Sequence, residues 1–301
     1  MNQRGATRRW QSAVLAAWCL VAGPVLAQRV LVVATSDGVP YQQALAGIVK
    51  QGLPVEALQL SRDSEATLAA AMARAGRDTI IVALGVSAAN VVARAAPPAA
   101  IVNCMVLGQD DGRGASGTQL VPLEVPIETH ILWLKRLLPQ ARTVGLLFDP
   151  MHNDRRVADT AAALARAGYR AVLEPVASPS ALPAALNRLT NSAEVLQAIP
   201  DTTVFAKEHS RALLLFSFRN LIPLAGPSEA WVRAGALFAV DWDYPDLGRY
   251  CVALGQRLWA GSRAPMPAPA KTRVYVNLRT AQQLRIKWDV ETLRQVVPVA
   301  E

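Results

Sequence analysis

Short, solidly apolar runs alternate with longer amphipathic stretches along most of the chain. The run from Ile80 to Leu84 is apolar at every position, which is typical of a parallel strand covered by helices on both faces. The stretches between such runs place apolar residues three or four positions apart, which indicates helices. This alternation predicts an α/β fold built on parallel sheets.

The alternating elements form two sets, separated by a Gly-rich stretch over 108–117. The first set predicts strands at 29–34, 55–60, 79–84 and 100–106, and helices at 42–51, 64–75 and 87–95. The second predicts strands at 143–148, 171–175, 195–198 and 221–224, and helices at 127–138, 155–167, 180–189 and 206–219. A helix at 247–260, a Pro-rich connector around Pro267 and a strand at 274–277 are expected to follow.

Two sets of this size predict two Rossmann-like lobes. The returning elements of the tail indicate that the chain crosses between the lobes more than once, so that several strands share a hinge. We expect residues 28–122 and 241–262 to form the first lobe, and residues 123–240 and 272–290 to form the second. A ligand is then expected in the cleft between the lobes, at the carboxyl ends of the strands.

Residues 1–27 have the pattern of a cleaved secretory signal peptide. Arg4, Arg8 and Arg9 precede an apolar run over 13–25, and the run ends in a small-residue cleavage site at 25–27. The run is too short to span a membrane, and Cys19 lacks the small residue that directly precedes a lipoprotein cysteine. The mature protein is therefore expected in the periplasm, without a lipid anchor.

The charge of the mature chain argues against a nucleic-acid partner. The formal net charge is +8, and the loss of three arginines and no acids with the signal peptide lowers it to +5. The remaining arginines are scattered rather than gathered in a stripe with aromatic residues. Cys104 and Cys251 remain after cleavage, and they either pair in the oxidising periplasm or stay as buried thiols.

The sequence offers no chemistry that would make this an enzyme. His130, His152 and His209 lack the spacing of a zinc site and are better explained as surface or helix positions. The two carboxylates at 110–111 are too few for a calcium loop. A nucleophile elbow and a phosphate-binding Gly-Lys-Ser/Thr loop are both missing. We therefore expect no catalysis, no metal and no cofactor.

Several segments of the second half, taken together and in order, resemble one family. They are Ala-Ile-Pro-Asp-Thr-Thr-Val at 198–204, Pro-Ser-Glu at 227–229, Val-Arg-Ala-Gly-Ala-Leu at 232–237 and Asp-Leu-Gly-Arg at 246–249; 137–150 and 274–281 fit as well. The resemblance is to ABC-transporter substrate-binding proteins, including the tryptophan- and tyrosine-type binding proteins. It implies a type I periplasmic-binding fold with three crossings between lobes and a small-molecule ligand such as an amino acid. It also implies delivery of that ligand to an ABC permease in the inner membrane.

The chain departs from the family in its first lobe, which looks abbreviated, and at 107–112, where the family has Thr-Asp-Pro. The segment 240–246 is also longer than expected. An alternative function therefore stays open: a periplasmic sensory or accessory protein that keeps the fold without delivering a solute. In either case we expect a monomer.

The candidate ligand contacts are the residues that follow the strands. Asp201, Thr202 and Thr203 combine a carboxylate for a ligand ammonium group with hydroxyls for a ligand carboxylate. The alternative for Asp201 is a plain helix cap. Ser228 and Glu229, which come after Pro227, follow the next strand.

Asp241 and Trp242 are expected to follow a further strand, which comes after the segment 227–229. A carboxylate beside an indole suits a cationic or aromatic ligand, although Trp242 is as well explained by packing at the hinge. In the first lobe, Gly85 and Ser87 open a helix whose N–H groups suit an anion, with an ordinary cap as the alternative.

Ser36, Asp37 and Tyr41 follow the opening strand of the first lobe. They are in a position to close over the same solute from the opposite side of the cleft. The alternative, a turn followed by the start of a surface helix, is slightly favoured.

Overall fold

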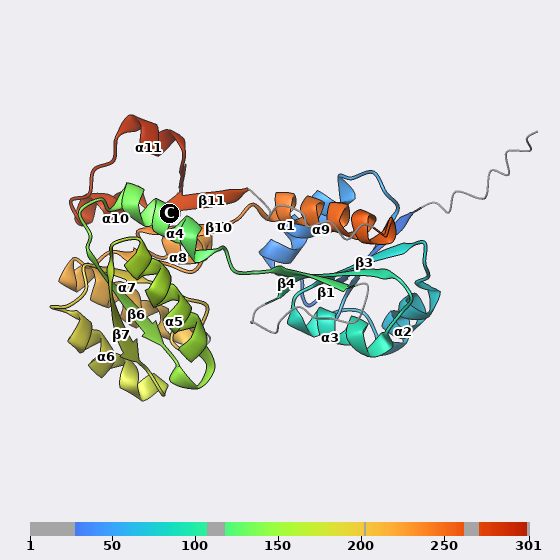
Figure 1. Cartoon of the computed structure of the whole chain (residues 1–301), viewed down its shortest axis with the longest axis horizontal. Coiled ribbons are helices and arrows are strands. Elements are labelled where there is room, and N and C mark those ends of the chain that lie inside the picture. Colours follow the sequence, from blue (N-terminus) through green and yellow to red (C-terminus); the bar gives the residue numbers. More distant parts are fainter. Residues whose placement is uncertain (1–27, 107–117, 202, 262–270, 300–301) are drawn as a thin grey trace, which may run out of the picture.

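The computed structural model describes residues 28–106, 118–201, 203–261 and 271–299. Two α/β lobes lie side by side and are joined by crossing segments (Figure 1). The expected signal peptide, the Gly-rich stretch, Thr202 and the Pro-rich connector lie outside the described residues. The two-lobed α/β architecture with parallel sheets confirms the fold class expected from the sequence.

The first lobe is built on a parallel sheet with the strand order β2-β1-β3-β4-β5. The strands are β1 (Arg29–Ala34), β2 (Val55–Gln59), β3 (Thr79–Leu84), β4 (Ala100–Val106) and β5 (Thr118–Pro122). Strand β3 lies in the middle, and each of its residues is buried. The two-sided apolar pattern at 80–84 is thus explained by helices on both faces.

Two pairs of helices cover this sheet. Helices α2 (Glu65–Arg74) and α3 (Val86–Ala95) pack on one face, and α1 (Val39–Val49) and α9 (Tyr244–Trp259) pack on the other. Helix α9 follows strands of the second sheet in the sequence, yet it lies alongside α1 over the first sheet (Figure 1). The first lobe is therefore completed by a segment that comes late in the chain.

The second lobe is built on a sheet with the strand order β12-β11-β10-β9-β8-β6-β7. The strands are β6 (Thr143–Phe148), β7 (Arg170–Pro175), β8 (Val195–Gln197), β9 (Leu224–Ala225), β10 (Phe238–Trp242), β11 (Thr272–Val276) and β12 (Val297–Pro298). All neighbours run parallel except β10 and β11, which are antiparallel. The antiparallel pair is where the chain returns from α9 to the second sheet.

Helices cover both faces of the second sheet as well. Helices α4 (Ile127–Leu137), α5 (Pro150–Arg166) and α10 (Leu278–Gln283) contribute to one core. Residues of α11 (Val290–Arg294) and of the segments beside it pack against the same core. Helices α6 (Leu182–Leu189) and α7 (Ser210–Asn220) contribute to the other, beside α8 (Glu229–Arg233). Two short 3₁₀ turns, η1 (Pro179–Ala181) and η2 (Lys207–His209), precede α6 and α7.

Local capping shifts several helix starts away from the expected positions. Helix α5 begins at Pro150 instead of 155, because the Asp149 carboxylate accepts a hydrogen bond from the Met151 N–H (2.9 Å) and proline suits the first turn. Helix α9 begins at Tyr244 instead of 247, because Asp243 caps it in the same way. In both cases the sequence signal for the helix start is an aspartate that lies one or two positions before a proline.

Other differences concern short elements that lack a periodic pattern. The sequence did not predict β5, α8, α10, α11 or β12. The strand expected at 221–224 is instead β9, because Leu221 adopts a left-handed conformation at the end of α7 (φ 54°). Asp241 and Trp242 lie within β10 rather than after it, in the second sheet. The exact bounds of the two lobes stay a prediction.

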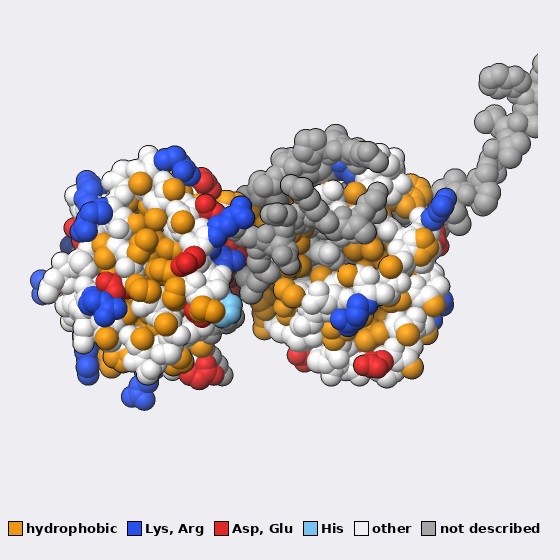
Figure 2. Space-filling view, turned by 60° about the horizontal axis from the view of Figure 1, so that its bottom comes forward, with side chains coloured by type: hydrophobic (Ala, Val, Ile, Leu, Met, Phe, Trp, Pro, Cys, Tyr) orange, Lys and Arg blue, Asp and Glu red, His pale blue; other side chains and the backbone are white. Residues whose placement is uncertain are grey.

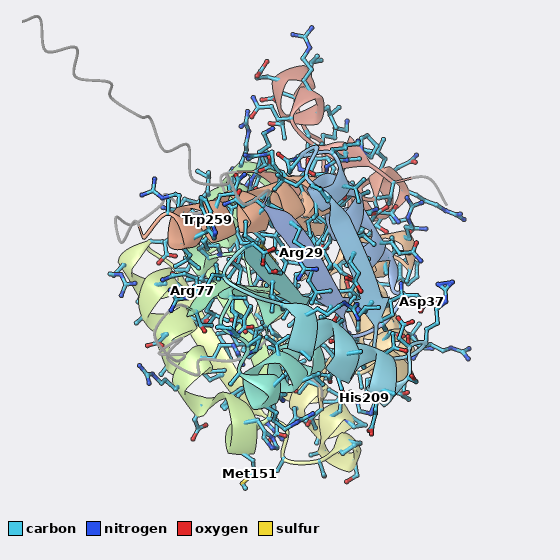
Figure 3. All side chains as sticks on the ribbon, turned by 90° about the vertical axis from the view of Figure 1, so that its right-hand side faces the viewer. Arg29, Asp37, Arg77, Met151, His209 and Trp259 are labelled. Carbon is cyan, nitrogen blue, oxygen red and sulfur yellow. A yellow bond between two sulfur atoms is a disulfide. The ribbon has the colours of Figure 1, made fainter. Side chains whose placement is uncertain are left out.

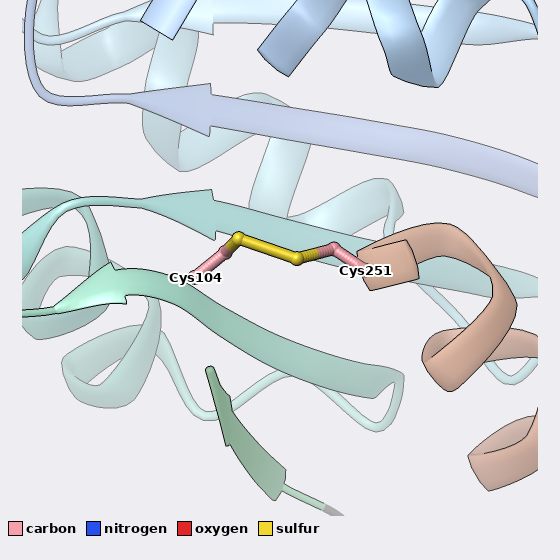
Figure 4. Close-up of a disulfide and its surroundings, with 2 residues drawn as sticks. All are labelled: Cys104 and Cys251. Atoms are coloured by element: carbon pink, nitrogen blue, oxygen red, sulfur yellow. A yellow bond between two sulfur atoms is a disulfide. The ribbon is translucent and has the colours of Figure 1, made fainter. Parts of the chain in front are cut away.

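A disulfide joins Cys104 of β4 to Cys251 of α9 (Figure 4). Both residues are fully buried in the core of the first lobe, together with Trp242. The sequence left open whether these cysteines pair or stay as buried thiols, and in the structure they are paired. The bond fastens α9 covalently to the first sheet.

Helices α1 and α9 also approach each other unusually closely. A Cβ atom added at Gly248 would lie 2.0 Å from the backbone oxygen of Ala44, and one added at Gly47 would lie 1.9 Å from the backbone oxygen of Pro245. Only glycine at these two positions allows the two backbones to meet. Gly248 belongs to the Asp-Leu-Gly-Arg motif, so this contact is a physical reason for that motif.

Candidate functional site

A cleft of about 510 Å³ lies at the carboxyl ends of the strands in the second sheet. Its walls come from the crossing between β5 and α4, from α4 and α5, from the segments after β8 and β9, and from β10 and the start of α9. Most of the lining residues are apolar. The polar or charged side chains that matter below are Glu124, His130, Arg156, Gln197, Ser228, Asp241 and Tyr244.

Asp241 provides a buried carboxylate in this cleft. Its side chain Oδ1 accepts hydrogen bonds from the hydroxyl of Tyr244 (2.7 Å) and from the backbone N–H of Trp242 (2.8 Å). Burial raises the pKa of Asp241, while the hydrogen bonds from Tyr244 and from the backbone oppose that rise. Burial and the neighbouring Asp241 also raise the pKa of Tyr244, so this phenol stays a hydrogen-bond donor.

His130 and Gln197 form a neutral polar pair in the same cleft. His130 projects from α4, and its Nδ1 lies 3.5 Å from the Gln197 side-chain nitrogen. Burial lowers the pKa of His130 to about 4, so the imidazole is uncharged near neutral pH. The sequence analysis explained this histidine by a surface or helix position; it is on a helix, but it lines the cleft.

An ion pair ties the first crossing segment to the second lobe. Arg156 of α5 binds Glu124, which lies between β5 and α4, through its Nε (3.2 Å) and Nη2. The remaining terminal nitrogen, Nη1, donates to the Asn153 side chain and to the backbone oxygen of Pro200 (3.3 Å). Two hydrogen bonds from Arg156 thus fasten the crossing to α5, and two more hold the guanidinium group against the second lobe.

Asp201 occupies a structural position behind the cleft. Its Oδ1 accepts from the backbone N–H groups of Thr203 and Val204 (both 2.8 Å), and its Oδ2 accepts from the Asp149 N–H (2.6 Å) and the Asn153 amide (2.8 Å). This geometry caps a turn rather than a helix, which differs from the plain helix cap weighed for this residue, because the next helical element begins only at Lys207. A direct contact of Asp201 with ligand stays a prediction.

Replacing Asp201 with alanine is expected to lower the free energy of unfolding by about 2–4 kcal/mol, because four donors, three of them buried, lose their acceptor. Urea unfolding of residues 28–301 measures it. The control is Asp154→Ala, an exposed position on α5, for which a change within about 0.5 kcal/mol is expected. Equal stability of the two variants would contradict the structural assignment of Asp201.

The other predicted residues of the second lobe surround the cleft to different degrees. Ser228 lines it together with Pro227. Glu229, at the start of α8, affects the pKa of Asp241 in two ways: a hydrogen bond from its backbone N–H lowers that pKa, and the charge of its carboxylate raises it. Thr203 turns its hydroxyl away to Asp149 (2.7 Å). Trp242 is buried in the core of the first lobe, where its indole N–H has no hydrogen-bond partner among the described residues.

The predicted residues of the first lobe do not line the 510 Å³ cleft. Gly85 is the N-cap residue of α3, with φ 94°, and Ser87 is an exposed residue inside the first turn of the helix, so Ser87 is not the cap. A Cβ atom at Gly85 would lie 2.6 Å from Thr35 Oγ1, a hydroxyl that accepts from the Ala88 N–H.

Ser36 accepts from the Gly38 N–H within the turn after β1 (3.4 Å). The side chain of Asp37 is exposed and lies at the rim of the molecule in Figure 3. Tyr41 is half-buried and lies near enough to Tyr244 to contribute to its raised pKa. Of these three first-lobe candidates, Tyr41 has the clearest link to the cleft.

Sequence reasoning missed Glu124, Arg156, His130, Gln197 and Tyr244. Gln197 is the last residue of β8, so a polar residue at the end of a strand was the signal that could have identified it. The other four lie in a crossing or on helices, where a polar residue has no distinguishing pattern. The cleft therefore draws on residues that only the tertiary fold brings together.

The described residues contain neither a metal cluster nor a membrane-spanning helix. Within those ranges, no three His, Cys, Asp or Glu side chains converge so as to hold a metal ion. None of the helices in the described part of the chain combines the length and apolar character that crossing a bilayer requires. Lys and Arg side chains are spread over both lobes on the face in Figure 2.

Comparison with solved structures shows the same fold in proteins of low sequence identity. The ABC domain from Streptococcus pneumonia in complex with L-Trp is 17% identical and has a TM-score of 0.59; the match covers 91% of this chain and 99% of that one. The ligand-free, open form of a substrate-binding protein with adhesive properties from Clostridium difficile is 16% identical, with a TM-score of 0.72 and coverage of 90% and 99%.

A sugar-binding protein of an ABC transporter from Bacillus halodurans is 12% identical, with a TM-score of 0.58 and coverage of 85% and 99%. No curated protein matches the sequence. The family model described as "ABC transporter substrate binding protein" matches residues 58–297, most of the chain. The chain belongs to this family of extracytoplasmic proteins, which bind a small molecule for an ABC permease.

Proposed function

We propose that this protein is the periplasmic binding component of an ABC uptake transporter and that it takes a small organic solute, such as an amino acid, into the cleft. The observation that carries the proposal is the cleft itself, at the carboxyl ends of the parallel strands beside two crossings. Its volume of about 510 Å³ lies within the usual range of ligand pockets. Apolar walls with a few polar groups are also typical of such pockets.

The arrangement of the lobes supports a mechanism of closure. The second lobe and the crossings form the walls of the cleft, whereas Ser36, Gly85 and Ser87 belong to the facing lobe and do not line it. A solute that contacts both lobes only when they close shifts the equilibrium towards the closed form, which a permease can read. In this proposal the protein performs no chemistry, needs no metal or cofactor, and acts as a monomer.

A screen for thermal stabilisation tests the proposal. Residues 28–301 would be melted with amino acids, amines, sugars, nucleosides and short peptides, since a ligand of the native state raises the melting midpoint. We expect one compound class to raise it, with saturation in calorimetry. Small-angle scattering should then show a smaller radius of gyration with the ligand than without it, because the lobes close.

A variant that fills the cleft provides the specificity control. Ala198→Met adds a long side chain to the wall, so it should abolish stabilisation by the ligand. Ala162→Met makes the same change at an exposed position of α5 outside the cleft, and should leave stabilisation unchanged. A folded protein that is silent across the library would contradict solute delivery and favour the sensory or accessory alternative.

A further inference from the structure

Among the residues that the structure describes, no cationic side chain forms an ion pair with the carboxylate of Asp241. Its partners are the Tyr244 hydroxyl and backbone N–H groups, and no ion pair joins it to Lys, Arg or His within the described ranges. The charge of Glu229, which raises the pKa of Asp241, has the same sign. Arg273, the strand partner of Asp241 on β11, forms its ion pair with Asp243 instead. A buried carboxylate that lines an apolar cleft without a counter-charge is costly, and a cation placed there would remove that cost.

Among the described residues that line the cleft, none is a cation free to bind an anion. Arg156 is the one Lys or Arg that lines it in the described part of the chain. Its Nε and Nη2 serve Glu124, and its Nη1 serves Asn153 and Pro200. Because His130 is neutral, the groups that remain for a solute on this lobe are acidic or uncharged.

We infer that the second lobe selects its solute by an ammonium group held against Asp241, so that organic amines bind whether or not they also carry a carboxylate. This inference rests on the proposed function and names the head group of the solute. A carboxylate can accept further N–H hydrogen bonds beyond those that Asp241 already receives. The Tyr244 ring next to it adds an aromatic surface that favours a cation.

The apolar walls define the rest of the solute. Leu123, Val125 and Ile127 come from the first crossing and the start of α4. Ile199 comes from the segment after β8, and Val240 from β10. These side chains suit an alkyl or aryl body and offer little to a sugar, whose hydroxyls need hydrogen-bond partners. The class is therefore an amine with an apolar body.

A matched series of ligands tests the head group. For each of three bodies, phenyl, indolyl and alkyl, calorimetry would compare the amine, the amino acid and the acid without nitrogen: phenethylamine, phenylalanine and 3-phenylpropionate in the phenyl set. We expect an amine and its amino acid to bind within about tenfold of each other. The matching acid should bind at least about 30-fold more weakly, the size of one lost charge-assisted contact.

Asp241→Asn is the decisive variant, since it keeps the shape of the side chain and removes its charge. The expected result is at least a 30-fold loss of affinity for the amine. Asp154→Asn makes the same change of net charge at an exposed site of α5 and should change the affinity less than twofold. A thermal melt shows whether Asp241→Asn is folded; if it is not, the ligand series and the pH profile of the unaltered protein still decide.

Acid should weaken amine binding, because only the ionised Asp241 attracts the ammonium group. The raised pKa of Asp241 means that affinity falls with decreasing pH from a higher pH than it would for an ordinary aspartate, by about tenfold per unit. The titratable and charged groups around it are Tyr244 of α9, Glu229 of α8, and Tyr275 and Arg273 of β11, of which Arg273 is paired with Asp243. Both tyrosines keep their protons, since burial raises the pKa of Tyr244, and raises that of Tyr275 to about 12.

The outcomes separate this inference from the proposed function. Amine binding that depends on Asp241 supports both. Tight binding of an acid, a sugar or a nucleoside that is unaffected by Asp241→Asn overturns the ammonium inference and leaves solute binding in place. Absence of binding by every amine, with the protein folded, overturns the inference, and absence of binding by every class overturns the proposed function too.

Discussion

Replacing Gly248 with alanine is expected to lower the free energy of unfolding of the first lobe by about 3 kcal/mol. The added Cβ would lie 2.0 Å from the backbone oxygen of Ala44, so α9 and α1 have to move apart rather than a side chain rotate. The gain of about 1 kcal/mol in helix propensity from glycine to alanine only partly offsets this. Urea unfolding followed by tryptophan fluorescence reports it, because Trp242 lies in the same core.

The same substitution at two other glycines provides the comparison. Gly47→Ala should cost a similar amount, because its Cβ would lie 1.9 Å from the backbone oxygen of Pro245. Gly255→Ala, on α9 itself, would meet the Ile80 side chain at 2.3 Å, and a side chain can adjust more easily than a backbone. We expect the loss at Gly255 to be smaller; a Gly248→Ala protein as stable as the original would contradict the backbone contact.

Replacing both Cys104 and Cys251 with alanine is expected to cost about 3–5 kcal/mol of unfolding free energy. The two cysteines are 147 residues apart, so the bond shortens a very long loop of the unfolded chain, and the entropic gain is near the upper end of the usual range. Urea unfolding of the double variant and of the unaltered protein, both as residues 28–301, measures the difference.

A thiol assay provides the control for the disulfide. Residues 28–301 should show no free thiol when denatured without reductant, and two when denatured with it. Unfolding in reductant should bring the unaltered protein close to the double variant, since both then lack the cross-link. Two reactive thiols in the non-reduced denatured protein, or equal stability of the two proteins, would contradict the assignment.

Sequence patterns predict the long elements of this fold well, and the reason is physical. The run at 79–84 is apolar throughout, and in β3 it is buried on both faces, while helices such as α4 carry apolar residues at helical spacing. Elements of two to six residues, such as β12 and α10, have too few positions to show a period. Their existence depends on neighbours distant in sequence, as when β12 pairs with β11.

The candidate site is less accessible to sequence reasoning. Polar residues near strand ends led to Ser228 and Asp241, which do line the cleft. The same reasoning could not reveal that the Asp201 carboxylate is occupied by donors from the segment at 149–153. Nor could it pair Glu124 with Arg156, since 32 positions separate them and neither stands in a motif.

The late position of α9 affects the order in which the protein can be completed during synthesis. The first lobe begins at β1, but its core still lacks α9 and the partner of Cys104 until residue 251 has emerged. By then every strand from β6 to β10 of the other lobe has already been made. The first lobe is therefore completed only after most of the second has been made, and β11 and β12 of the second sheet still follow. A nascent chain that stops before α9 leaves one face of its first sheet only half covered.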